Sequence, residues 1–295
     1  MIKIVVVAPG YFAPSGGPEA LHQLVYMCNE VESGSAAIYY ESDNVVESCI
    51  QPYQKYNCPR IKKQDIPPSA LVILPEIWPE LSSSFVNNCA LWWLSVDFFG
   101  SHGHSNLDGI DLHLTQSRYA YDYVVNQLKK PAMMLSDWID LDCNDVLDKS
   151  NSVCVNPSKG LSLIESFESQ NKDLRVIKLQ SMTKDQLITT LSTSKIYIDF
   201  GHHPGKDRIP REASLCGCVV FVKKEGAGCY FEDVYIDDYY KFDDINELDD
   251  KVKDVMNNFS VHKSNQRTYQ DKIKKEKDTF RIEVKKLLEV SECTI

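Results

Sequence analysis

Short apolar runs alternate with helical patterns along almost the whole chain, and this alternation limits the possible folds more than any other feature. The runs lie at residues 2–8, 36–40, 71–74, 90–96, 112–115, 132–135, 153–156, 174–179, 195–200 and 218–222. They are nearly continuous apolar segments and do not alternate strictly between apolar and polar residues. Strands of that kind form parallel sheets that are covered by helices on both faces. The sequence therefore predicts an α/β fold built from doubly wound parallel sheets.

The segments between these runs carry helix signals. Apolar residues of segment 18–31 recur on one helical face. The stretch 183–186 is a capping-box pattern that opens a second helix. Pro210 at the start and Gly217 at the end bracket a third helix. The residues from about 261 to 290 are expected to form one long charged helix.

A polar stretch at residues 140–151 divides the strands into two groups. The chain has 295 residues, enough for two domains at roughly 100–200 residues each. We therefore expect two Rossmann-like domains, one at residues 1–145 and one at residues 146–295, the second including the C-terminal helix. Two such domains facing each other form a cleft at the carboxyl ends of their strands, where open α/β sheets bind ligands.

Composition and charge exclude several classes of protein. The chain is 43% hydrophobic and 25% charged, which is ordinary for a globular protein and unlike a disordered or fibrous one. No apolar stretch approaches the roughly 18–20 residues of a membrane span, and the first run is a poor signal peptide. The formal net charge of −10 argues against nucleic-acid binding. A cytoplasmic protein is expected.

The ten cysteines include no C-x-x-C pair. Several lie inside apolar runs, as in segments 153–155 and 216–220. We therefore expect free buried thiols in preference to disulfides or a zinc site, which stay open as alternatives.

The turn after the first strand is the first candidate binding element. Gly16 and Gly17 come directly before an amphipathic helix, so backbone N–H groups there are not obstructed by side chains. Such a turn suits a diphosphate or a sugar. The alternative is a loop that needs glycine only for its own turn.

The densest signal lies at residues 197–220. A strand ends near Gly201, and a loop then carries three cations into the helix opened by Pro210; they are Lys206, Arg208 and Arg211. Formal charge and the helix dipole together predict an anion site. Glu212, in the first turn of this helix, is expected to accept hydrogen bonds from ribose hydroxyls. A solvated charge cluster is the alternative.

Other candidates also follow predicted strands. Lys159 sits at a helix start and is either a phosphate partner or a capping lysine. Asp97, with His102 nearby, is a candidate general base or acceptor-binding group. An H-x-H pair with His104 has no visible third ligand, so no metal site is expected. Glu76 could reach the same edge but is a weaker candidate.

The segment 263–286 carries nine basic and four acidic residues in an otherwise acidic chain. Peripheral contact with anionic lipid head groups is one interpretation, which would place the protein at the inner face of the cytoplasmic membrane. A solvated helix packed back onto the protein is the other.

Three motifs resemble the GT-B glycosyltransferases, in which two Rossmann-like domains bind a nucleotide sugar between them. Residues 15–24 resemble the glycine-rich first loop of that fold, and residues 156–160 resemble its lysine–glycine turn. Residues 205–220 resemble its nucleotide-binding helix. The longer combination resembles bacterial glycosyltransferases of surface-polysaccharide synthesis, such as O-antigen, lipopolysaccharide and capsule.

The resemblance implies roles for particular residues. Lys159, Lys206 and Arg208 would face the diphosphate, and Glu212 would hold the ribose. Gly16 and Gly17 would line the donor or acceptor side. Retaining members commonly have two glutamates separated by seven residues, and the first of them would fall where this chain has Pro204.

The resemblance also implies an activity. A hexosyltransferase would move a sugar from a nucleoside-diphosphate donor, with UDP as the expected carrier, to a saccharide or lipid-linked saccharide acceptor. No cofactor is expected, because cations of the protein would stabilise the leaving diphosphate in place of a metal. Asp97 is the expected acceptor base, with His102 beside it. The alternative is a non-catalytic nucleotide-sugar-binding subunit, which Pro204 favours. A Rossmann dehydrogenase is disfavoured because the first turn lacks G-x-G-x-x-G.

Overall fold

Parallel strand pairs form the frame of the protein. The computed structural model describes residues 1–10, 15–41, 51–99, 106–141, 143 and 148–293. Its first sheet has the order β2 (Ala36–Tyr40), β1 (Ile4–Ala8), β3 (Leu71–Pro75), β4 (Cys89–Trp93), β5 (Leu112–Thr115) and β6 (Ala132–Met134). Its second sheet has the order β11 (Lys241–Phe242), β10 (Val219–Lys223), β9 (Ser194–Asp199), β7 (Ser150–Val155) and β8 (Arg175–Lys178). Each of these pairings is parallel, as the apolar strands predict.

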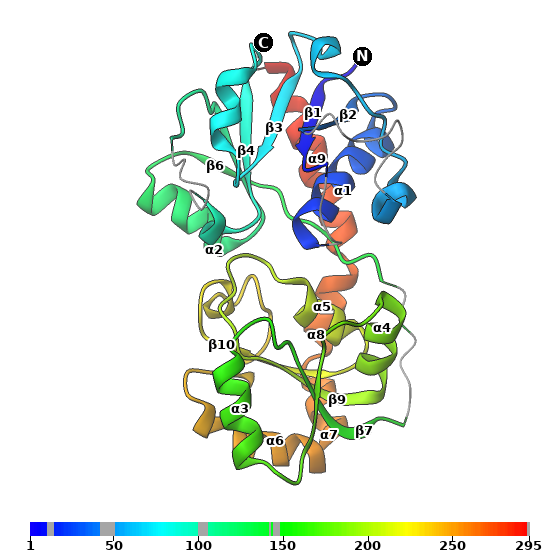
Figure 1. The fold of residues 1–295 in the computed structure, drawn as a ribbon, viewed down its shortest axis with the longest axis vertical. Coiled ribbons are helices and arrows are strands. Elements are labelled where there is room, and N and C mark those ends of the chain that lie inside the picture. Colours follow the sequence, from blue (N-terminus) through cyan, green and yellow to red (C-terminus); the bar gives the residue numbers. More distant parts are fainter. Residues whose placement is uncertain (11–14, 42–50, 100–105, 142, 144–147, 294–295) are drawn as a thin grey trace. The chain divides into compact units, whose positions relative to one another are not determined.

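Helices connect the strands (Figure 1). The α-helices are α1 (Gly16–Val31), α2 (Arg118–Asp122), α3 (Leu161–Gln170), α4 (Lys184–Thr193), α5 (Arg208–Leu215), α6 (Leu248–Asn257), α7 (Phe259–Asn265), α8 (Arg267–Lys274) and α9 (Glu276–Cys293). A π-helical turn covers Tyr123–Gln127. Short 3₁₀ turns cover Gln51–Tyr56, Lys63–Asp65, Pro79–Ser84, Val96–Phe98, Ala227–Cys229, Asp238–Tyr240 and Ile245–Glu247.

The chain divides into two compact units. The first comprises Met1–Trp138 together with Glu276–Ile295, and the second comprises Ile139–Lys275. The expected division at residues 145 and 146 lies a few residues further along the chain. It also grouped the last helix with the second domain, whereas the structure groups α9 with the first unit.

The first unit buries both faces of its sheet. Neighbouring residues of β4 show this, because side chains along a strand point alternately to opposite faces. Trp92 packs in the apolar cluster that includes Leu24 of α1 and Phe280 of α9. Trp93 packs on the other face with Val124 and residues near α2. This two-sided burial explains the nearly continuous apolar strands in the sequence.

The second unit has one apolar cluster around β7, β9 and β10. Val155, Ile198 and Val220 are fully buried in it, and Ala213 of α5 and Val252 of α6 pack against the sheet. The strand β11 was not expected from the sequence. It contributes only two residues, too few for a pattern of apolar positions to be visible.

Predicted helix signals agree with the structure at the start of α4. The hydroxyl of Thr183 accepts from the Gln186 N–H at 3.2 Å, and the Gln186 side chain accepts from the Thr183 N–H at 2.9 Å. The expectation of one helix from 261 to 290 is wrong, because the chain there forms α7, α8 and α9. The helix is interrupted at Gln266, whose side chain bonds both the N–H and the carbonyl of Val220 in β10.

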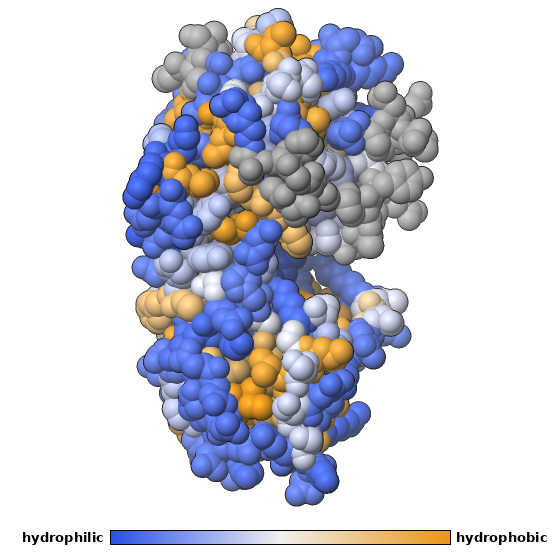
Figure 2. All heavy atoms as spheres, turned by 60° about the vertical axis from the view of Figure 1, so that its left-hand side comes forward, coloured by the Kyte–Doolittle hydropathy of each residue, from blue (hydrophilic) through white to orange (hydrophobic). Residues whose placement is uncertain are grey.

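The surface is mainly hydrophilic on the face that Figure 2 shows, with scattered hydrophobic residues. No helix of the described residues is long and apolar enough to cross a membrane. Eight cysteines within the described ranges are free thiols, as expected; they are Cys28, Cys58, Cys89, Cys143, Cys154, Cys216, Cys218 and Cys229.

Candidate functional site

Two turns meet at the carboxyl edge of the second sheet, and glycine permits the contact. Gly160, in the turn after β7, has a φ of +66°, and a Cβ there would lie 2.6 Å from the carbonyl oxygen of Phe200. Gly201, directly after β9 and Phe200, would place a Cβ 2.2 Å from the Cβ of Lys159. Only glycine fits both positions without displacing the backbone or its neighbour. The close approach puts Lys159 against the loop that leads into α5.

Lys159 is held by that loop. Its ammonium forms an ion pair with Asp207 and donates to the carbonyl of His202 at 3.2 Å. The sequence predicts Lys159 as a phosphate partner, and the structure places it at the carboxyl edge of the second sheet. Its charge there is shared with Asp207, which the sequence analysis had not singled out.

Asp207 belongs to a cluster that sequence reasoning missed. Asp199, the last residue of β9, accepts from the Tyr197 hydroxyl at 2.8 Å and from the Gly201 N–H at 3.0 Å. Burial raises the pKa of Tyr197 well above its usual range, so its hydroxyl remains a donor. The imidazole of His203 lies between Asp199 and Asp207, with its Nε2 3.8 Å from Asp199 Oδ1 and its Nδ1 3.3 Å from Asp207 Oδ2.

The only signal for this cluster in the sequence was the regular spacing of its three residues. Asp199, His203 and Asp207 are four residues apart, but no regular element was expected between the strand and the helix. The loop that follows β10 fixes His203 in place. The His203 carbonyl accepts from the Ala227 N–H at 2.9 Å, and a Cβ on Gly228 would lie 3.3 Å from the imidazole Cδ2.

The start of α5 carries the predicted basic residues. The buried guanidinium of Arg211 donates to the carbonyls of Asp207 at 3.1 Å and Lys206 at 2.8 Å. It therefore shapes the loop, a role that the sequence analysis did not assign to it. The Nε of Arg208 lies 3.7 Å from a carboxylate oxygen of Glu212, and both side chains are mostly buried.

Lys159, Lys206, Arg208 and Glu212 thus come from two turns of one sheet edge. The N-terminus of α5 adds its partial positive charge to the same edge. This combination of cations and backbone N–H groups is suited to a phosphate-containing ligand. A carboxylate beside it, here Glu212, is suited to hydroxyl groups.

The remaining predicted residues belong to the first unit. Gly16 and Gly17 form the first turn of α1. A Cβ on Gly17 would lie at an ordinary distance of 3.8 Å from Leu94, so packing does not require glycine there. Asp97 lies exposed in the 3₁₀ turn after β4. His102 lies outside the described residues.

Glu76 lies at the same edge of the first sheet as Asp97, but it is buried. One of its carboxylate oxygens accepts from the Leu94 N–H at 3.2 Å. Burial raises the pKa of Glu76 to about 8, an effect that its backbone hydrogen bonds only partly offset. This side chain therefore carries a proton at neutral pH and fixes the loop between β4 and Asp97.

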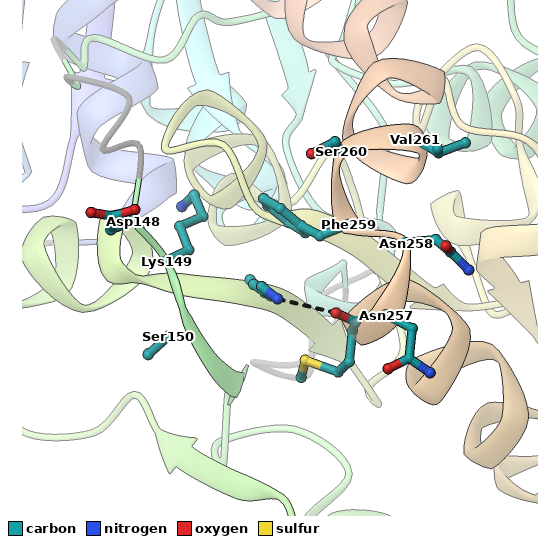
Figure 3. Close-up of a pocket in the computed structure, with 10 residues that line it drawn as sticks. Asp148, Lys149, Ser150, Asn257, Asn258, Phe259, Ser260 and Val261 are labelled. Carbon is teal, nitrogen blue, oxygen red and sulfur yellow. Dashed lines mark hydrogen bonds between the residues drawn. The ribbon is translucent and has the colours of Figure 1, made fainter.

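A cavity of about 720 Å³ lies at the opposite, amino-terminal edge of the second sheet. Residues 148–150 line one side of it and residues 257–261 the other (Figure 3). Its two lysines bond to the protein itself. Lys149 donates to four backbone carbonyls, and Lys195 donates to the Met256 carbonyl at 3.0 Å. Both ammonium groups are therefore held by backbone carbonyls at this edge of the sheet.

Comparison with known proteins identifies the fold. No protein-family model matches the sequence, and no curated protein matches it significantly. The structure is similar to sucrose-phosphate synthase from Thermosynechococcus elongatus, with a TM-score of 0.72, 11% identity and 100% of each chain covered. HepE from Anabaena, solved with UDP-glucose, has a TM-score of 0.63 at 10% identity, again over 100% of each chain.

T4 phage β-glucosyltransferase has a TM-score of 0.58 at 10% identity, over 98% of this chain and 99% of that one. It too has been solved with UDP-glucose. Identities this low show the fold alone. The fold is the two-domain α/β architecture of the GT-B glycosyltransferases, as the sequence motifs predicted.

Proposed function

We propose that the protein is a glycosyltransferase that moves a hexose from a nucleoside-diphosphate sugar to an acceptor hydroxyl. The observation that carries the proposal is the basic edge of the second sheet, where Lys206 and Arg208 flank the N-terminus of α5. Open α/β sheets bind ligands at the carboxyl ends of their strands. The similarity to structures solved with UDP-glucose supports UDP as the carrier.

The proposed chemistry needs little covalent participation by the protein. As the bond between the sugar and the diphosphate breaks, negative charge accumulates on the departing diphosphate. Lys206, Arg208 and the N–H groups at the start of α5 would stabilise that charge in the transition state. Glu212 would accept hydrogen bonds from the ribose.

Asp97 is the proposed base for the acceptor hydroxyl if the reaction inverts the anomeric carbon. It is exposed, whereas the nearby Glu76 is buried and protonated at neutral pH. His102 stays a prediction from the sequence. If the reaction retains configuration, the leaving phosphate could itself take the proton.

The acceptor is proposed to be a saccharide or lipid-linked saccharide of bacterial surface-polysaccharide synthesis. Contact with the inner face of the cytoplasmic membrane through the basic segment 263–286 is part of this proposal. Some of its basic side chains are already engaged: Lys272 donates to the Glu232 carbonyl, and Lys277 lies over the rings of Tyr26 and Trp138.

A titration of UDP in the presence of EDTA tests the donor site. Replacing Lys206 and Arg208 together with alanine should weaken UDP binding by about 100-fold or more, because each charge-assisted hydrogen bond is worth about 1.5–3 kcal/mol. Lys251→Ala is the matched control, since Lys251 of α6 pairs with Glu247 in the preceding 3₁₀ turn, and it should leave the affinity unchanged. Calorimetry on the intact chain measures both.

Equal UDP affinity in the double variant and the parent would refute the proposed site. Hydrolysis of UDP-glucose distinguishes a glycosyltransferase from a non-catalytic nucleotide-sugar-binding subunit. Slow release of glucose by the parent supports a transferase. Tight UDP binding without release of glucose supports the non-catalytic subunit, which the proline at position 204 favours.

A further inference from the structure

We propose that Asp199, His203 and Asp207 bind a divalent transition-metal cation. Each of these side chains offers one ligand atom, and the three atoms lie within 4.8 Å of one another. Two ligands of one metal ion with bonds of about 2.0–2.2 Å lie at most about 4.4 Å apart, so a small shift of these side chains would bring all three atoms to bonding distance. The expectation of no metal rested on the H-x-H pair of His102 and His104, which lacks a third ligand, and on cations of the protein replacing a metal at the diphosphate; it did not consider these three residues.

The second observation is the state of the His203 side chain. It is fully buried, yet neither of its ring nitrogens has a hydrogen-bond partner among the residues that the structure describes. Buried polar groups are nearly always bonded, because leaving one unpaired costs about 1–3 kcal/mol. Both nitrogens point toward carboxylates, at separations of 3.8 Å and 3.3 Å. A cation bound to one ring nitrogen would satisfy that nitrogen, and the other ring nitrogen would keep its proton and face a carboxylate.

The third observation is the balance of charge. Asp199 is only 1% exposed, and its hydrogen bonds come from two neutral groups, the Tyr197 hydroxyl and the Gly201 N–H. Asp207 is paired with the ammonium of Lys159. Beside a neutral His203 imidazole, which is the form that binds a metal, two carboxylates and one ammonium leave one negative charge uncompensated. Buried charges require a partner, and a divalent cation supplies it.

The ligand types favour particular ions. Carboxylate oxygens suit Mn²⁺, Mg²⁺ and Ca²⁺, whereas imidazole suits Zn²⁺ and other transition metals. A mixed set of one nitrogen and two oxygens therefore favours Mn²⁺ or Zn²⁺ over Mg²⁺. The ion would enter from the side of Asp207, whose side chain is 20% exposed.

Lys159 competes with the metal for Asp207. An ammonium and a metal ion would share one carboxylate, and their mutual repulsion weakens binding. Removing the ammonium should therefore strengthen it. If the proposed function holds, a bound cation would also add positive charge next to Lys206 and Arg208, where the diphosphate would lie.

Electron paramagnetic resonance of Mn²⁺ tests the site on the intact chain without any nucleotide. Titration of Mn²⁺ into the parent should remove the free-ion signal with one ion bound per chain, and Zn²⁺ should displace it. Asp207→Asn should weaken binding by about tenfold or more. Lys159→Met should strengthen it, a change of opposite sign that misfolding would not produce. Spin-echo modulation should show a directly bound imidazole nitrogen.

Asp243→Asn is the control. Asp243 is one of two exposed carboxylates next to Lys224, so this variant should bind Mn²⁺ as the parent does. The proposal is refuted if folded parent and Lys159→Met both fail to bind Mn²⁺ and Zn²⁺. It is also refuted if Asp207→Asn binds like the parent, or if no nitrogen coupling appears. Since UDP binding is measured in EDTA, failure of either proposal is distinguishable from failure of the other.

Discussion

Individual charged residues in this protein differ in role because of their surroundings. Arg208 and Arg211 lie three positions apart in α5, and both were expected to face an anion. Arg211 is buried and bonds the carbonyls of Lys206 and Asp207, so it builds the loop. Arg208 lies beside Glu212 at the start of the helix. The basic motif of this chain therefore combines Arg211, which holds the loop, with Arg208, which is proposed to bind the diphosphate.

Glu76 provides a prediction at the same scale. Its pKa is raised from 4.5 to about 8 by burial, so the unfolded chain releases the proton at lower pH than the folded chain does. Stability should therefore fall as pH rises from about 5 to about 8. Glu76→Gln, which mimics the protonated form, should remove this loss, which is on the order of 3 to 5 kcal/mol.

Tryptophan fluorescence measures this effect in the first unit. The sequence has four tryptophans, at positions 78, 92, 93 and 138, and all of them lie in that unit. Urea unfolding at several pH values gives the free energy of unfolding at each pH, and from these values its slope against pH. Glu41→Gln, on an exposed residue, is the control and should keep the slope of the parent. An unchanged slope in Glu76→Gln would contradict the assignment.

At the scale of elements, the site depends on two turns that touch backbone to backbone. Gly160 is the N-cap of α3 and has a left-handed backbone conformation. It lies against the backbone of Phe200, the residue that follows β9. A side chain at position 160 would separate the turn that carries Lys159 from the loop that carries Asp207. The position of these two residues therefore depends on a glycine that takes no part in binding.

Gly160→Ala should destabilise the second unit by about 3 kcal/mol or more, from about 1–2 kcal/mol of backbone strain plus the overlap with Phe200. Gly34→Ala is the matched control. It has a φ of +75° with nothing within 4 Å of its Cβ, so only the strain remains. Circular dichroism during urea unfolding measures both variants. Equal losses in the two variants would show that the contact between the turns is not tight.

At the scale of the whole molecule, the last helix returns to the first unit. Phe280 of α9 is fully buried, with its ring centroid 5.3 Å from that of Trp138 and 6.4 Å from that of Trp92. Glu283 of the same helix accepts from both the N–H and the hydroxyl of Ser136 at 2.7 Å. The first unit is therefore built from both ends of the sequence.

Phe280→Ala should destabilise the first unit by about 3–5 kcal/mol, because it removes a large buried ring and leaves a cavity. Ile282→Ala is the control on the same helix, since Ile282 is 56% exposed, and it should change the free energy by less than about 0.5 kcal/mol. Tryptophan fluorescence reports the unfolding of the first unit directly. Equal stabilities for the two variants would mean that α9 does not complete this core.

The sequence alone determined the strands other than β11, the parallel sheets, and the positions of Lys159, Lys206, Arg208 and Glu212 after them. These features are local, because apolar runs, caps and turn glycines act over a few residues. Tertiary structure alone decided that Asp199, His203 and Asp207 meet, and that Asp207 takes the ammonium of Lys159. It also decided that α9 packs on the first unit. Such contacts depend on how turns and helices from different parts of the chain pack together. A local pattern of residues does not show this packing.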